Sequence, residues 1–141
     1  TLNASQDAER RSDIRTALFD AHAINIECDR IKHLAMELKQ NYQSLAIFSG
    51  VSGGSRDEMY QKASFEKHSY ALSLAKLASE LIAEPSTLDS LDKIAVDTKK
   101  LELSTTLLKL SALREQMADE LSSLRLRNSE ALNLKLAEKI K

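Results

Sequence analysis

The sequence has few residues of the kinds that interrupt a chain or cross-link it. Its 141 residues include three Gly, one Pro and one Cys, and no Trp. Sheet proteins need many turns, and turns draw on Gly and Pro, so this composition excludes a sheet fold. One cysteine allows no internal disulfide and no cysteine-based metal cluster. The fold class that remains is all-α.

A large surplus of charge of one sign and a long apolar run are missing as well. The 20 Lys and Arg and 21 Asp and Glu residues are interspersed and give a formal net charge of −1. Such a chain has no broad single-sign field to attract nucleic acid or an anionic membrane. The sequence also lacks the apolar run of about 18 residues that is needed to cross a bilayer. We expect no nucleic-acid partner and no membrane insertion of this segment. The lone cysteine favours an intracellular location, cytoplasmic or nuclear.

The most regular pattern is a heptad repeat in the first third of the chain. Ten successive a and d positions carry no charge: Ile14, Ala17, Ala21, Ile24, Cys28, Ile31, Ala35, Leu38, Tyr42 and Leu45. A spacing that averages about 3.5 residues is typical of the seam between supercoiled helices. It predicts one helix over about 4–48.

All three glycines lie within residues 49–55. Gly50 can end the first helix in the left-handed conformation, and Ser55 with Glu58 forms a capping box for a second helix over about 56–83. A phosphate-binding loop is the alternative. It lacks the Gly-Lys-Ser/Thr ending and the preceding strand of a P-loop, so we interpret the segment as a turn between helices.

The second helix is expected to fold back antiparallel on the first and to be followed by an antiparallel third helix. Its face of Tyr60, Ala63, Tyr70, Leu74, Leu77 and Leu81, with Ala71, Ala75, Ala78 and Ile82 beside it, would then pair Tyr42 with Ala63 and Cys28 with Leu77. Pro85 ends this helix, and Ser86 with Asp89 can cap a third helix over about 87–139. A tight turn here would place Ile94, Leu101 and Leu108 against the second helix.

The expected lengths of the helices differ. At 1.5 Å per residue the third helix measures roughly 80 Å and the second roughly 40 Å, so the last 25 or so residues of the third, and the start of the first, should extend past the second. We therefore predict one domain over 1–141, an all-α antiparallel bundle or coiled coil of three long helices with a protruding C-terminal helix.

Both overhangs are amphipathic, which predicts that they bind a partner. The predicted partner interface comprises Ile14, Ala17 and Leu18 at one end and Met117, Leu121, Leu124, Asn128, Leu132 and Leu136 at the other. A buried Asn on such a seam can fix register or oligomeric state, as we suggest for Asn128. Alternatively, Asn128 or Ser129 caps a short last helix that folds back.

Residues suited to chemistry are sparse and scattered. His22, His33 and His68 form no i, i+4 pair of the kind that binds metal on a helix. Cys28 lies on the apolar seam and is expected to be a small buried side chain. We expect no catalytic residue, no metal and no cofactor, and hence no enzymatic activity.

These patterns favour a non-catalytic interaction protein, a scaffold-like subunit that packs coiled-coil helices against a protein partner or a second copy. The alternative is the extracytoplasmic helical ligand-sensing domain of a bacterial transmembrane receptor. That alternative needs both termini at one end of the bundle, and hence a helix break near Thr105 or Asn128. The chain begins with Thr and ends within an apolar repeat, as expected of a piece of a longer protein.

Overall fold

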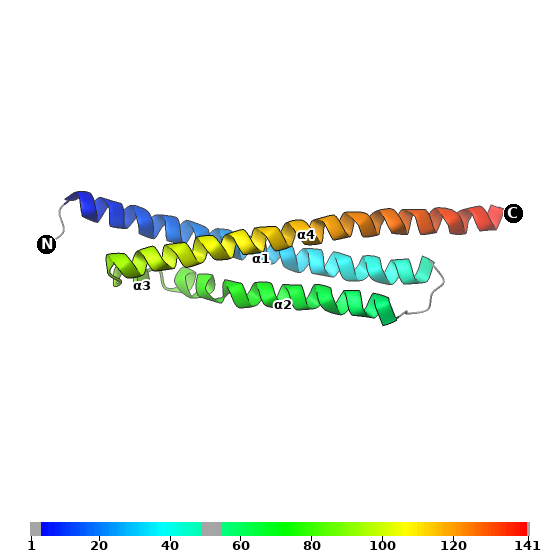
Figure 1. The fold of residues 1–141 in the computed structure, drawn as a ribbon, viewed down its shortest axis with the longest axis horizontal. Coiled ribbons are helices and arrows are strands. Elements are labelled where there is room, and N and C mark those ends of the chain that lie inside the picture. Colours follow the sequence, from blue (N-terminus) through cyan, green and yellow to red (C-terminus); the bar gives the residue numbers. More distant parts are fainter. Residues whose placement is uncertain (1–3, 49–54, 141) are drawn as a thin grey trace. The chain divides into compact units, whose positions relative to one another are not determined.

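The computed structural model describes residues 4–48 and 55–140, and it confirms the all-α class. The helices are α1 (Ala4–Phe48), α2 (Ser55–Ala83), the single turn α3 (Ser86–Asp89) and α4 (Lys93–Ile140), in the order that Figure 1 traces by colour. The described residues include no strand. The third helix was expected to begin near residue 87. Instead, the helix that begins at Ser86 is a single turn, and the long helix begins at Lys93. No stretch of the described helices is long and apolar enough to cross a membrane.

The contacts between backbone segments divide the chain into two compact units. Unit 1 comprises Thr1–Asp29 and Ala71–Ala112, and unit 2 comprises Arg30–Tyr70 and Leu113–Lys141. Parts of α1, α2 and α4 belong to each unit. Each unit has its own buried residues and its own polar contacts.

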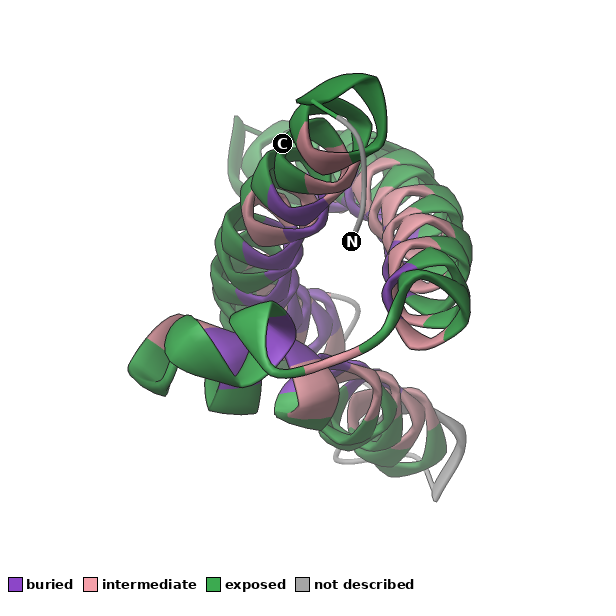
Figure 2. Cartoon of the chain, turned by 90° about the vertical axis from the view of Figure 1, so that its left-hand side faces the viewer, coloured by how far each residue is buried: buried purple, intermediate pink, exposed green. Residues whose placement is uncertain are grey.

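The heptad seam of α1 is buried as predicted. All ten of its a and d residues, from Ile14 to Leu45, are less than a tenth exposed. In unit 1 they are buried together with Leu88 of α3 and with Val96, Leu103 and Leu110 of α4; in unit 2 they are buried with Met117, Leu121 and Leu124 of α4. Figure 2 shows that the buried positions of the long helices follow one side of each helix. The 3.5-residue period therefore identified the inner side of α1 correctly.

The inner side of α2 is shifted from the centre of the predicted face toward the alanines expected beside it. Its buried residues are mainly small, namely Ser64, Ala71, Ala75 and Ala78 with Leu81, while Tyr70 is 52% exposed. Tyr42 stacks on Tyr60, three residues before the predicted Ala63, and the Cys28 thiol donates to the carbonyl oxygen of Ala71 at 3.3 Å, six residues before the predicted Leu77. Small side chains let helices approach closely, so Ala71, Ala75 and Ala78 form most of the buried face, together with Leu81.

The inner side of α4 also differs from the predicted one. Ile94, Leu101 and Leu108, which were expected to face α2, are 77, 68 and 72% exposed. The buried series in unit 1 is Val96, Leu103 and Leu110, two residues further along. Two residues turn a helix by about 200°, so the predicted face and the buried face lie on opposite sides of α4.

The connection between α2 and α4 explains this difference. The prediction assumed a tight turn, whereas Ser86–Asp89 form α3, and Asp92 then caps α4 by accepting a bond from the Ala95 N–H at 2.8 Å. Arg10 of α1 donates to the backbone oxygen of Asp89 at 2.6 Å and also to that of Leu91. This guanidinium satisfies carbonyl groups that the end of α3 leaves unpaired and ties the connection to α1.

Polar contacts show that α1 and α4 run parallel with one register. In unit 1, Lys100 binds Asp13 at 3.0 Å, 87 residues away in sequence. In unit 2 the separation is 87 for Asn128 with Asn41 and 88 for Arg125 with Glu37 and for Lys135 with the carbonyl of Ile47. Because α1 accompanies α4 as far as Lys135, the mostly exposed end of α4 is shorter than expected, and it begins after Asn128.

Two leucines two residues apart test this orientation of α4. We expect Leu110→Ala to lower the free energy of unfolding by about 2–5 kcal/mol, because Leu110 is fully buried. Leu108→Ala should change it by less than about 0.5 kcal/mol, because Leu108 is exposed. Urea unfolding followed by circular dichroism measures both. A larger loss for Leu108 than for Leu110 would show that the sequence-based orientation was right.

Candidate functional site

Most residues of the predicted partner interface are packed inside the chain itself. Ile14 and Ala17 in unit 1, and Met117, Leu121, Leu124 and Asn128 in unit 2, are all buried, and Leu18 is half-buried. Only Leu132 and Leu136 are exposed, at 40 and 49%. In this conformation the six buried residues offer no surface to another molecule, and their apolar spacing reflects packing between α1 and α4.

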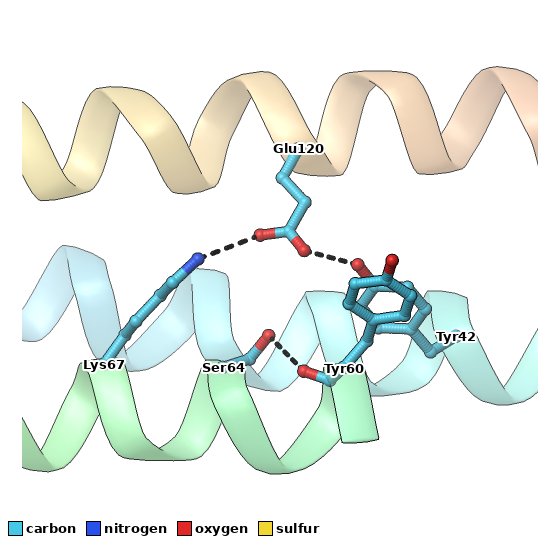
Figure 3. Close-up of polar contacts among 5 residues, drawn as sticks. All are labelled: Tyr42, Tyr60, Ser64, Lys67 and Glu120. Atoms are coloured by element: carbon cyan, nitrogen blue, oxygen red, sulfur yellow. Dashed lines mark hydrogen bonds and ion pairs between the residues drawn. The ribbon is translucent and has the colours of Figure 1, made fainter. Parts of the chain in front are cut away.

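A polar cluster joins all three long helices in unit 2 (Figure 3). The Tyr42 hydroxyl of α1 donates to one oxygen of Glu120 of α4, and Lys67 of α2 lies 3.4 Å from the other oxygen. The Tyr42 and Tyr60 rings stack 5.5 Å apart at 7°. Burial, and then the hydrogen bond to Glu120, raise the pKa of Tyr42. A protonated phenol, an amine and a shared carboxylate hold the three helices at one relative position.

Asn128 makes a second polar contact in unit 2. Its side-chain nitrogen donates to the backbone oxygen of Asn41 at 2.9 Å and to the side-chain oxygen of Asn41 at 3.3 Å. The α4 helix continues through Asn128 without a break, which contradicts the alternative of a short folded-back helix. The asparagine lies on the buried seam as expected, and its partner is α1 of the same chain.

Cys28 is buried in unit 1, as its place on the seam predicted. Burial, and then the neighbouring Asp29 and Glu27 charges, raise the pKa of its thiol to about 11. A thiol needs a lowered pKa to act as a nucleophile or a metal ligand, so this environment suppresses both. Within residues 4–48 and 55–140, no group of three or more His, Cys, Asp or Glu side chains is placed to hold a metal ion.

The surface feature that the sequence reasoning placed in the core is an apolar row on α4 of unit 1. We call it the outer stripe, and it consists of Ile94, Thr98, Leu101, Thr105, Leu108 and Ala112. All six residues are exposed and none is charged. Their alternating three- and four-residue steps make them successive a and d positions of a heptad whose f positions are the buried Val96, Leu103 and Leu110. The heptad pattern was visible in the sequence, but not the direction in which it points.

A shallow groove borders the outer stripe on its α2 side. It has a volume of about 440 Å³ and is lined by Leu77, Leu101, Glu102, Thr105, Thr106 and Lys109. Leu77 and Leu101 give the groove an apolar floor, while Glu102 and Lys109 place one charge of each sign at its rim. A shallow groove of this kind suits a further helix better than a small molecule, because small-molecule pockets are deeper.

The Tyr42 hydroxyl provides a test of the polar cluster. We expect Tyr42→Phe to lower the free energy of unfolding by about 1.5–3 kcal/mol, because it removes a hydrogen bond to a charged group. Tyr70→Phe is the matched control, since Tyr70 is exposed. Unfolded tyrosine ionises near pH about 10 while folded Tyr42 stays protonated, so stability should fall as pH rises above that value. That alkaline loss should be weaker in Tyr42→Phe, and urea titrations at a series of pH values measure it.

Cys28 should react slowly in the folded chain. A pKa raised from 9.0 to about 11 makes the thiolate roughly 100-fold rarer at pH 8 than in the unfolded chain. We expect labelling by a chromogenic disulfide reagent to be slower by at least about that factor. The urea-unfolded chain is the control. Equal rates in the folded and unfolded chains would contradict the buried placement of Cys28.

Comparisons of the chain with protein-family models, with curated proteins and with solved structures gave no match.

Proposed function

We propose that this chain is a non-catalytic helical interaction subunit, which docks a further helix on the outer stripe of α4. The observation that carries the proposal is the position of the stripe, directly opposite the buried face of the same helix. Within the described chain, α2 reaches the stripe only at its edge, where Leu77 borders Leu101 and Thr105, and the stripe residues stay exposed. An exposed apolar row at coiled-coil spacing is a feature of surfaces that bind another helix.

The composition of the stripe supports this proposal. A helix face that remains in water usually carries charged residues, and 29% of this sequence is charged. Here six successive a and d positions carry none, and three of them are Ile or Leu that are more than two-thirds exposed. Covering such side chains stabilises a complex by about 25 cal/mol per Å² of apolar area removed from water.

The exposed end of α4 in unit 2 is a second surface for the same function. Leu132 and Leu136 are the members of the sequence-predicted interface that remain exposed, and Ile140 follows at the same four-residue step, 87% exposed. This row is shorter than the outer stripe. We assign it a supporting role in assembly with a protein partner, as a homo- or hetero-oligomer.

No observation favours the alternative of a receptor sensor domain. The sensor needs a helix break near Thr105 or Asn128 to bring both termini to one end, and α4 is continuous at both residues. The described residues of α4 therefore lack the break that the sensor alternative requires.

Site-specific photocrosslinking in cells that produce the protein tests the proposal. A photoreactive amino acid at Leu101 or Leu108 should trap one discrete protein, because both residues would be covered in the complex. The control position is Ser79, which is exposed on α2. Mass spectrometry identifies the trapped protein, whether it is a second copy or another chain. If the Leu101 and Leu108 positions trap nothing beyond the Ser79 background, the proposed function fails.

A further inference from the structure

We infer that the occupant of the outer stripe is the outer stripe of a second copy, lying antiparallel to it. This inference rests on the proposed function and names its partner. It follows from the order of large and small residues along the stripe and from the charges on either side of it.

The order of side chains in the stripe suits antiparallel self-pairing. From Ile94 to Leu108 the large residues occupy d positions and Thr98 and Thr105 occupy a positions. In an antiparallel pair each layer combines an a residue of one helix with a d residue of the other. With the two-fold axis midway between Thr98 and Leu101, Leu101 faces Thr98 of the second copy, and Ile94 faces Thr105. Each of the four layers between residues 94 and 105 then packs a large side chain against a small one, while Leu108 and Ala112 lie beyond the overlap.

The flanking charges select the antiparallel orientation over the parallel one. Within the overlapping residues 94–105, the g positions carry Asp97 and Ser104, and the e positions carry Ala95 and Glu102. The next e residue, Lys109, lies beyond the overlap. In a parallel pair, g lies beside e of the other helix, so Asp97 would lie beside Glu102 twice. In the antiparallel pair, g lies beside g and e beside e, so Asp97 lies beside Ser104 and Glu102 beside Ala95. The antiparallel register therefore avoids both like-charge contacts.

The extent of the stripe sets the expected strength of the dimer. In this register residues 94–105 of the two helices overlap over about 17 Å, and half of the paired positions are Thr. The groove beside Leu77 adds apolar contact on the α2 flank. A seam this short lies at the small end of specific interfaces, so we expect a reversible dimer with a dissociation constant on the order of 10 μM.

Sedimentation equilibrium of the whole purified chain, from well below to well above that concentration, tests the association. The unmodified chain should pass from monomer to dimer. Leu101→Glu should raise the dissociation constant at least about tenfold, because it places a charge in a central layer. Ile26→Glu is the matched control, since Ile26 is 54% exposed on α1 and should leave the dimer unchanged. Circular dichroism checks that both variants remain folded.

Cysteine crosslinking tests the orientation. A mixture of Ile94→Cys and Thr105→Cys chains, oxidised with copper phenanthroline, should form the mixed disulfide dimer, because these two residues share a layer in the antiparallel pair. The unmodified chain is the control for Cys28, which is buried. Efficient crosslinking of Ile94→Cys with itself, without the mixed product, would show a parallel pair and overturn the inference.

The experiments distinguish a failure of self-pairing from a failure of the proposed interaction function. A purified chain that stays monomeric at all concentrations overturns self-pairing, whatever the photocrosslinking result. If Leu101 then traps a different protein in cells, the interaction function stands and the second copy is wrong. A dimer that is unaffected by Leu101→Glu but lost in Ile26→Glu would also overturn the inference, because it would place the contact on α1.

Discussion

The parallel pairing of α1 with α4 is the constraint on which the rest of the structure depends. Four pairs of residues in contact across these helices are separated by 87 or 88 residues, one in unit 1, Lys100 with Asp13, and three in unit 2, ending at Lys135 with Ile47. This register buries the whole a and d seam of α1 and turns Val96, Leu103 and Leu110 inward. The same rotation turns Ile94, Leu101 and Leu108 outward. The rotational orientation of α4 therefore determines both the core and the proposed docking surface.

Apolar packing by itself does not fix that register. Leu103, Leu110, Met117 and Leu124 repeat every seven residues, so sliding α4 by one heptad would again place large apolar residues on the seam of α1. Polar contacts remove this ambiguity because the residues that make them do not repeat every seven positions. Asn128 finds Asn41, and Glu120 receives both the Tyr42 hydroxyl and the Lys67 amine. A shifted helix would leave a buried amide and a partly buried carboxylate without these partners, which is costly.

The sequence was sufficient for the fold class and for the inner face of α1, because α1 carries one uncharged heptad series there. It was insufficient for α4, which carries two apolar series on opposite sides. Choosing between them requires the path of the α2–α4 connection. That path is fixed by Arg10, which binds carbonyl groups about 80 residues away, a contact that no local pattern announces. The same cause explains why Met117 to Asn128 were predicted to bind a partner. With a tight turn before α4, these residues would extend past α2, whereas they are buried within the chain.

A high leucine content does not account for the outer stripe. Beyond Ala112, the next two positions of its heptad are the charged residues Glu115 and Asp119, although Leu113, Leu121 and Leu124 keep leucine frequent in the same part of α4. Charge therefore interrupts the outer side of the helix where unit 2 begins, while the inner side stays apolar, and the same heptad resumes further on with the exposed Leu126, Leu136 and Ile140. Glu115 and Asp119 therefore divide the exposed uncharged positions of α4 into two rows, the outer stripe in unit 1 and the shorter row near Leu136 in unit 2. Two rows separated by charge are what two docking surfaces of limited length require.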